Sequence, residues 1–133
     1  VVVAVLAGVS EELLFRGVLQ NITLRASGNP HVAIWFAAFV FSFIHFQFYG
    51  FFPRMLLGAL FGYLYYWTKN IWVPIFAHFV NNGFTLLMAY LYSTKAVEVN
   101  IEDTKSVPLT MALGSLLLTA LILRWFWMKR VIN

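Results

Sequence analysis

Long apolar segments constrain the fold of this chain more than any other feature. Five of them follow one another, with short breaks between, at residues 1–26, 31–48, 54–68, 71–92 and 107–128. Crossing the hydrocarbon core of a membrane takes about 20 residues of helix, whose backbone groups must hydrogen-bond within the segment. We therefore predict an all-α fold, a polytopic transmembrane helix bundle of about five spans.

The composition favours the same setting. Hydrophobic residues make up 62% of the chain and charged residues 11%, whereas soluble domains carry roughly 25% charged residues. The formal net charge of +4 would suggest a nucleic-acid ligand in a soluble protein, but here we expect cationic flanks that face a lipid bilayer and no nucleic acid. The absence of cysteine excludes disulfides, cysteine nucleophiles and thiolate metal sites.

Basic residues near the ends of the spans predict the orientation. The last apolar segment contains Arg124 near its end and is followed by Lys129 and Arg130. We therefore place the C-terminus in the cytoplasm and the polar loop 93–106 outside. The expected protein is a multi-pass protein of the cell membrane. Because the chain begins at Val1 rather than Met, we also expect it to be a piece of a longer protein.

Charged residues inside the first apolar segment are the strongest indication of function. Glu11, Glu12 and Arg16 lie there, and a charge at membrane depth costs a few kcal/mol on insertion scales. Glu12 and Arg16 are four residues apart, so they share a helix face and can pair. Glu11 is turned about 100° from Glu12 and stays free to point elsewhere. Such a placement indicates an intramembrane reaction site.

Three further polar side chains fall at a similar depth in other spans. His45 lies in the second segment, and His78 and Asn82 lie four residues apart in the fourth. At about 1.5 Å rise per residue, the positions of these side chains along their helices place them and Glu11 in one middle layer, within about two helical turns of each other. Each of these side chains could instead make an ordinary hydrogen bond between helices, but the convergence of all four in one layer favours catalysis.

The order of these residues resembles a known family. The matching positions are Glu11-Glu12-x-x-x-Arg16, Phe41-x-x-x-His45 and His78-x-x-x-Asn82. They resemble the three motifs of the CPBP family of intramembrane endopeptidases, which includes the CAAX prenyl proteases and the bacteriocin-processing proteins of the Abi family. The resemblance covers about residues 1–87, and members of that family usually have further helices before the first motif.

The resemblance implies a role for each residue. Glu11 would be the general base for water, His45 would help to hold and polarise that water, and His78 with Asn82 would donate hydrogen bonds to the oxyanion. Glu12 and Arg16 would support the first helix. The substrate would be a membrane-embedded peptide or protein. Residues 1–92 are then the catalytic membrane core, 93–106 a polar loop, and 107–133 a C-terminal transmembrane helix with a basic end.

Other functions stay open at the level of sequence. Glu11, His45 and His78 could hold zinc with water in the open position, as in a metalloprotease. We favour a protease without a cofactor, because Asn82 is a poor zinc ligand but a good oxyanion donor. From another class, the chain could be a non-catalytic membrane protein that confers bacteriocin immunity or binds a partner helix. A transporter with Glu11 as proton relay is disfavoured by the small number of helices and the lack of a repeat.

Overall fold

The computed structural model describes residues 2–98 and 108–131, and every regular element within these ranges is a helix. This confirms the all-α class. In chain order the elements are α1 (Val2–Glu12), the π-helix η1 (Leu13–Gln20), α2 (Asn21–Ser27), α3 (Pro30–Phe43), α4 (Phe51–Thr68), α5 (Trp72–Ser93) and α6 (Leu109–Met128).

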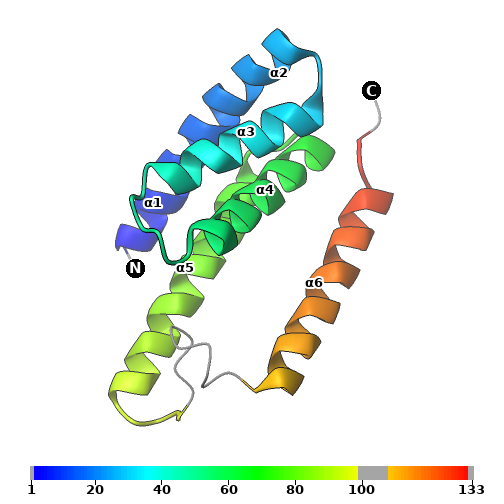
Figure 1. The fold of residues 1–133 in the computed structure, drawn as a ribbon. Helices are drawn as coiled ribbons and strands as arrows, with labels where there is room; N and C mark the ends of the chain where they lie inside the picture. The colour runs from blue at the N-terminus through cyan, green and yellow to red at the C-terminus, as the bar shows by residue number, and fades with distance from the viewer. Residues whose placement is uncertain (1, 99–107, 132–133) are drawn as a thin grey trace.

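The first three elements form one continuous helix, drawn in blue along one side of the molecule (Figure 1). It ends at Gly28, whose left-handed backbone (φ 68°) lets its N–H bond to the carbonyl of Leu24 at 2.8 Å. A glycine in this conformation is a frequent helix stop. The predicted first segment is therefore confirmed, whereas its π-helical stretch could not be foreseen from the apolar pattern.

The second predicted segment is too long by five residues. The helix α3 ends at Phe43 instead of residue 48, and α4 begins at Phe51 instead of residue 54. We expected residues 49–53 to form a non-helical connection, but Pro53 lies in the first turn of α4. Proline is tolerated there, because the first N–H groups of a helix have no intrahelical partner. His45 consequently lies in the turn after α3 and not within a helix.

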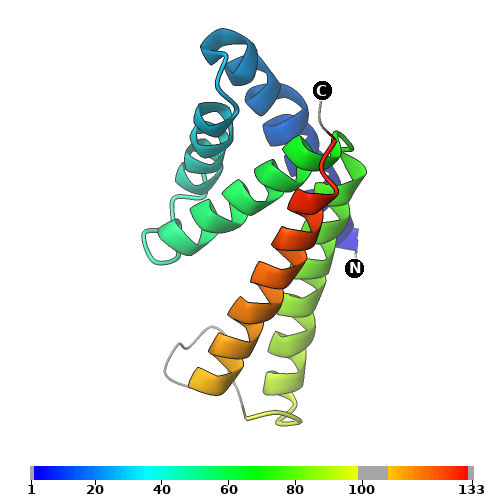
Figure 2. The same cartoon turned by 90° about the vertical axis from the view of Figure 1, so that its right-hand side faces the viewer.

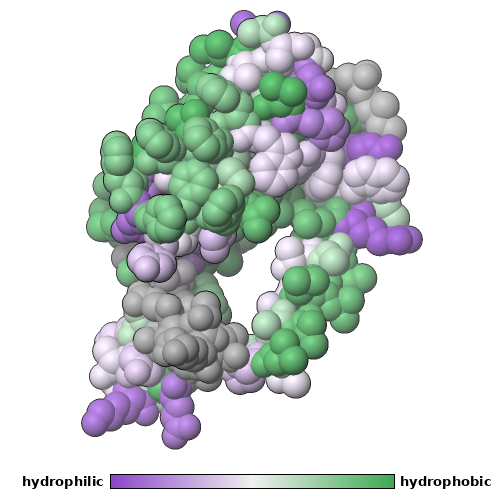
Figure 3. Space-filling model, viewed as in Figure 1, coloured by the Kyte–Doolittle hydropathy of each residue, from purple (hydrophilic) through white to green (hydrophobic). Residues whose placement is uncertain are grey.

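The last two segments match their predictions within two residues at each end. Residues 99–106 of the predicted polar loop lie outside the described ranges. The backbone N–H of Val131, after α6, donates to the carbonyl of Trp67 in α4 at 2.8 Å. A cavity of about 690 Å³ is lined mainly by apolar side chains of α4, α5 and α6, together with Asn81 and Thr119. Figure 3 shows the opening between α6 and the rest of the molecule, and Figure 2 shows α6 from the side.

Among the described residues, α6 is the one helix that is both long and apolar enough to cross a membrane by length and composition. The apolar helix α3 has 14 residues, or about 21 Å at 1.5 Å per residue, against a hydrocarbon core of about 30 Å. The prediction of about five spans stays a prediction.

The helices α3 and α4 pack closely on each other through small residues. Ile34, Ala38 and Ala59 form a buried cluster between them. A methyl group added to Gly58 would lie 3.3 Å from Ala38, and one added to Gly62 would lie 2.9 Å from Ile34. The small-xxx-small spacing of Gly58 and Gly62 therefore lets α4 approach α3 closely.

Candidate active site

Glu12 lies at the centre of the polar cluster and is completely buried. Its Oε1 accepts a hydrogen bond from Arg16 Nη1 at 2.9 Å, which confirms the predicted pair. The same oxygen lies 2.7 Å from Nδ1 of His78 in α5. Because an ionised carboxylate can only accept, Nδ1 of His78 carries the proton of this bond. Glu12 thus connects the first helix to α5 as well as to Arg16.

Arg16 is completely buried and joins the cluster to α4. Its Nη2 donates to the carbonyl of Gly58 at 2.5 Å, and its guanidinium carbon lies 5.4 Å from the ring centre of Phe41 and 5.6 Å from that of Phe61. Aromatic faces at this distance attract a guanidinium. The buried charge is therefore compensated by a carboxylate, a carbonyl and two aromatic rings.

One turn further along the first helix, Gln20 repeats this connection. It is also buried, and its Nε2 donates to the carbonyl of Gly62 at 3.2 Å. Gly58 and Gly62 are one turn apart on α4, as Arg16 and Gln20 are on the first helix. The two bonds together fix the register of α4 against the first helix.

Glu11 has a different environment from Glu12, as its position on the helix predicts. Its side chain is 30% exposed, and its Oε2 lies 3.6 Å from Nε2 of His78. The imidazole of His78 therefore lies between the two glutamates, with Nδ1 on Glu12 and Nε2 toward Glu11. Both glutamates immediately precede η1, and π-helical stretches occur frequently at functional sites.

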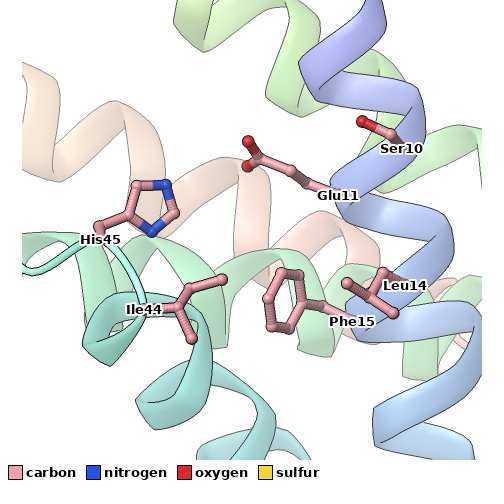
Figure 4. Close-up of a pocket in the computed structure, with 6 residues that line it drawn as sticks. All are labelled: Ser10, Glu11, Leu14, Phe15, Ile44 and His45. Atoms are coloured by element: carbon pink, nitrogen blue, oxygen red, sulfur yellow. The ribbon is translucent and has the colours of Figure 1, made fainter.

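A cavity of about 230 Å³ opens beside Glu11 and brings it near His45. In Figure 4 the carboxylate of Glu11 points toward the imidazole ring of His45. The ring is held by its Nδ1, which donates to the carbonyl of Phe41 at 2.6 Å, so Nε2 of the neutral ring is free to accept a hydrogen bond. The remaining lining residues are Ser10, Leu14, Phe15 and Ile44. The cavity can hold water between a carboxylate and an imidazole nitrogen.

Asn82 lies one turn beyond His78 on α5 and does not line this cavity. It borders a second cavity of about 210 Å³, together with residues from the beginning of α1. Its Oδ1 accepts a long hydrogen bond of 3.5 Å from Asn81 Nδ2. The structure therefore brings together Glu11, Glu12 and His78, with His45 across the cavity, and leaves the Asn82 amide in a neighbouring space.

The donor set does not fit the zinc site considered from the sequence. Within residues 2–98 and 108–131, no group of three or more His, Asp or Glu side chains is arranged to hold a metal ion. We therefore derive no step through a metal.

Sequence reasoning missed three features of this site. The bond from His78 to Glu12 had no signal, because it depends on how α5 packs against the first helix. Phe61, which stacks on His78, is one of 14 phenylalanines and carries no distinguishing pattern. Gln20 did have a signal, since it lies four residues after Arg16 and so shares the face of Glu12 and Arg16.

Comparison with known proteins places these residues in a family. Residues 1–84 match the family described as type II CAAX prenyl endopeptidase Rce1-like. The matched range includes Glu11, Glu12, Arg16, His45, His78 and Asn82. No solved structure is detectably similar to the chain.

Three curated bacterial proteins are also similar. The putative membrane peptidase YdiL of Bacillus subtilis (strain 168) is 31% identical over 88 residues, which cover 66% of this chain and 36% of YdiL. The membrane-embedded CAAX protease MroQ of Staphylococcus aureus (strain USA300) is 33% identical over 95 residues, covering 67% and 38% respectively. The uncharacterized protein YpbD of B. subtilis is 36% identical over 75 residues, covering 53% and 35%. The chain thus spans little more than a third of the length of these relatives.

Proposed function

The chain belongs to the Rce1-like family of type II CAAX prenyl endopeptidases, and we propose that it is an intramembrane endopeptidase in which Glu11 activates water. The observation that carries this proposal is the pair of environments around the two glutamates. Glu12 is buried, and its Oε1 is bonded to both Arg16 and His78, whereas Glu11 is partly exposed and faces a cavity that His45 also lines. A base must reach its water, and Glu11 alone of the two can.

In the proposed reaction, water lies in the cavity between Glu11 and His45. Glu11 takes a proton from this water as it attacks the carbonyl carbon of the peptide bond. His45 accepts a second hydrogen bond from the water through Nε2, because its Nδ1 is committed to the Phe41 carbonyl. Two acceptors orient the lone pair of the water oxygen toward the substrate. Glu11 then passes the proton to the leaving nitrogen, so that a carboxylic acid and an amine are released.

The attack leaves a negative charge on the former carbonyl oxygen, and we assign its stabilisation to His78 and Asn82. Donors that are already oriented in a water-poor site stabilise such charge much more than water does. Glu12 accepts a hydrogen bond from Nδ1 of His78 and so holds the ring with Nε2 toward Glu11. In its doubly protonated form the ring can donate from Nε2 to the oxyanion. Asn82 would add a second donor by turning its amide toward His78, one turn away on the same helix.

We further propose that these steps take place in a lipid bilayer, in a multi-pass protein of the cell membrane. The relatives YdiL and MroQ are named as membrane proteins. Large apolar side chains are also exposed on all the long helices, for example Val3 (76% exposed), Phe76 (66%) and Leu116 (69%). Such side chains would contact the hydrocarbon chains of lipids in a bilayer. The substrate would then be a membrane-embedded peptide or protein.

The test is cleavage by the purified protein in liposomes that carry a panel of membrane-embedded peptides. Mass spectrometry of the products identifies the broken bond, and each reaction is run with and without a strong zinc chelator. We expect cleavage that persists in chelator. Absence of cleavage on every peptide would contradict the proposed activity, and chelator-sensitive cleavage that added zinc restores would contradict the metal-free mechanism.

A further inference from the structure

Phe61 of α4 lies flat against the imidazole ring of His78. The two ring centres are 5.1 Å apart and the planes are inclined by 24°, and Phe61 is 1% exposed. We propose that Phe61 is a positioning residue for His78, one that sets the plane of the imidazole ring. This inference rests on the proposed function for its catalytic consequence, but the contact itself can be tested without any substrate.

The polar contacts of His78 do not fix the ring plane. The bond from Nδ1 to Glu12 and the approach of Nε2 to Glu11 both lie at the edge of the ring. The ring turns about its Cα–Cβ and Cβ–Cγ bonds, and one hydrogen bond at its edge does not lock both torsions. Stacking on Phe61 opposes this turning, because it covers one face of the imidazole. Phe41 adds an edge contact with ring centres 6.0 Å apart and planes at 86°.

Phe61 can act as a fixed reference because α4 is held against the helix that carries the glutamates. It lies between Gly58 and Gly62, whose carbonyls accept hydrogen bonds from Arg16 and Gln20. The Arg16 guanidinium also packs on the Phe61 ring at 5.6 Å. The same contacts therefore fix both the edge of the His78 ring, through Glu12 and Arg16, and its face, through Phe61.

The sequence allows a direct test by NMR, since the whole chain has three histidines. Protein with isotope-labelled histidine is studied in detergent micelles, and variants of His31 and His45 assign the remaining ring signals to His78. In Phe61→Leu we expect these signals to move downfield, because the ring current of Phe61 is lost, and to broaden as the ring tilts. In Phe61→Tyr they should stay near their original positions, since Phe61 also borders the large cavity, where a hydroxyl has room.

Activity gives the second readout. A displacement of about 1 Å at a reacting group can cost about 100-fold in rate, so Phe61→Leu should lower kcat about 10- to 100-fold and leave KM nearly unchanged. Phe61→Tyr should restore kcat. The matched control is Leu64→Ala, which opens space one turn away on α4 beside the same cavity. It should leave both the His78 signals and kcat in place.

Unchanged His78 signals in Phe61→Leu would overturn the inference, and so would an equal displacement in Leu64→Ala. If the protein cleaves no peptide, the proposed function fails, but the NMR comparison still decides whether Phe61 positions His78. Displaced signals with a normal kcat would overturn the catalytic role of the contact.

Discussion

Replacing Gly62 with alanine should destabilise the protein, because the added methyl group would collide with side chains of two neighbouring helices. The added methyl carbon would lie 2.9 Å from Gln20 Oε1 and 2.9 Å from Ile34 Cγ2, shorter than real contacts of this kind. Overpacking of this sort costs about 1–3 kcal/mol. Displacing Gln20 also breaks its hydrogen bond to the Gly62 carbonyl, which contributes about 1 kcal/mol.

The control for this change is Gly83→Ala in α5, where an added methyl group would meet no atom within 4 Å. Both glycines lie inside helices, so the gain in helix propensity, about 1 kcal/mol in water, cancels in the comparison. Gly62→Ala should therefore have a free energy of unfolding about 2–4 kcal/mol lower than that of Gly83→Ala. Gly58→Ala should fall between them, because its closest contacts would be 3.3 Å.

The assay is unfolding of the purified protein in mixed detergent micelles by added SDS, followed by circular dichroism. A double variant that also carries Gln20→Ala tests the mechanism, since removing the Gln20 amide should recover part of the loss. Equal stability of Gly62→Ala and Gly83→Ala would contradict this expectation, because it would mean that α4 does not approach the first helix and α3 this closely.

Three further changes test other parts of the site and its setting. Glu12→Gln should lower the free energy of unfolding by about 3–5 kcal/mol, since it leaves Arg16 as an uncompensated buried charge; a loss below about 1 kcal/mol in the same SDS titration would contradict this. Asn82→Ala should lower kcat about 10²–10³-fold, the usual cost of one oxyanion donor, and steady-state cleavage at saturating peptide measures it; an unchanged kcat would exclude Asn82 from the oxyanion site. A reporter fused after Asn133 should be active in the cytoplasm, and activity only outside the cell would reverse the predicted orientation.

Much of the fold follows from local sequence signals. Helix stops such as Gly28 need no tertiary information, and the pairing of Glu12 with Arg16 depends only on their spacing along one helix. The end of α3 was missed because residues 44–48 are apolar enough to continue a helix. What ends it is the reversal into α4, which is stabilised in part by the bond from the Ser42 hydroxyl to the Phe51 carbonyl, 2.6 Å long.

The candidate site was predictable in its members more than in its geometry. Polar residues are rare in this chain, so Glu11, His45 and His78 could be singled out by type and depth. Which nitrogen of His78 meets which glutamate depends on the rotation of α5 about its axis, and an apolar pattern does not encode it. For the same reason, the spacing of Asn82 from His78 did not reveal that its amide borders a different cavity.

Glu11 is proposed as the base, and a comparison of peptide cleavage by Glu11→Gln and Glu98→Gln tests this role. Each variant removes one carboxylate, but Glu98 is exposed and lies beyond α5. Both proteins are first shown by circular dichroism and SDS titration to be folded like the unmodified protein. We expect Glu11→Gln to lose cleavage and Glu98→Gln to keep it in full. Folded Glu11→Gln protein that cleaves at the normal rate would show that Glu11 is not the base.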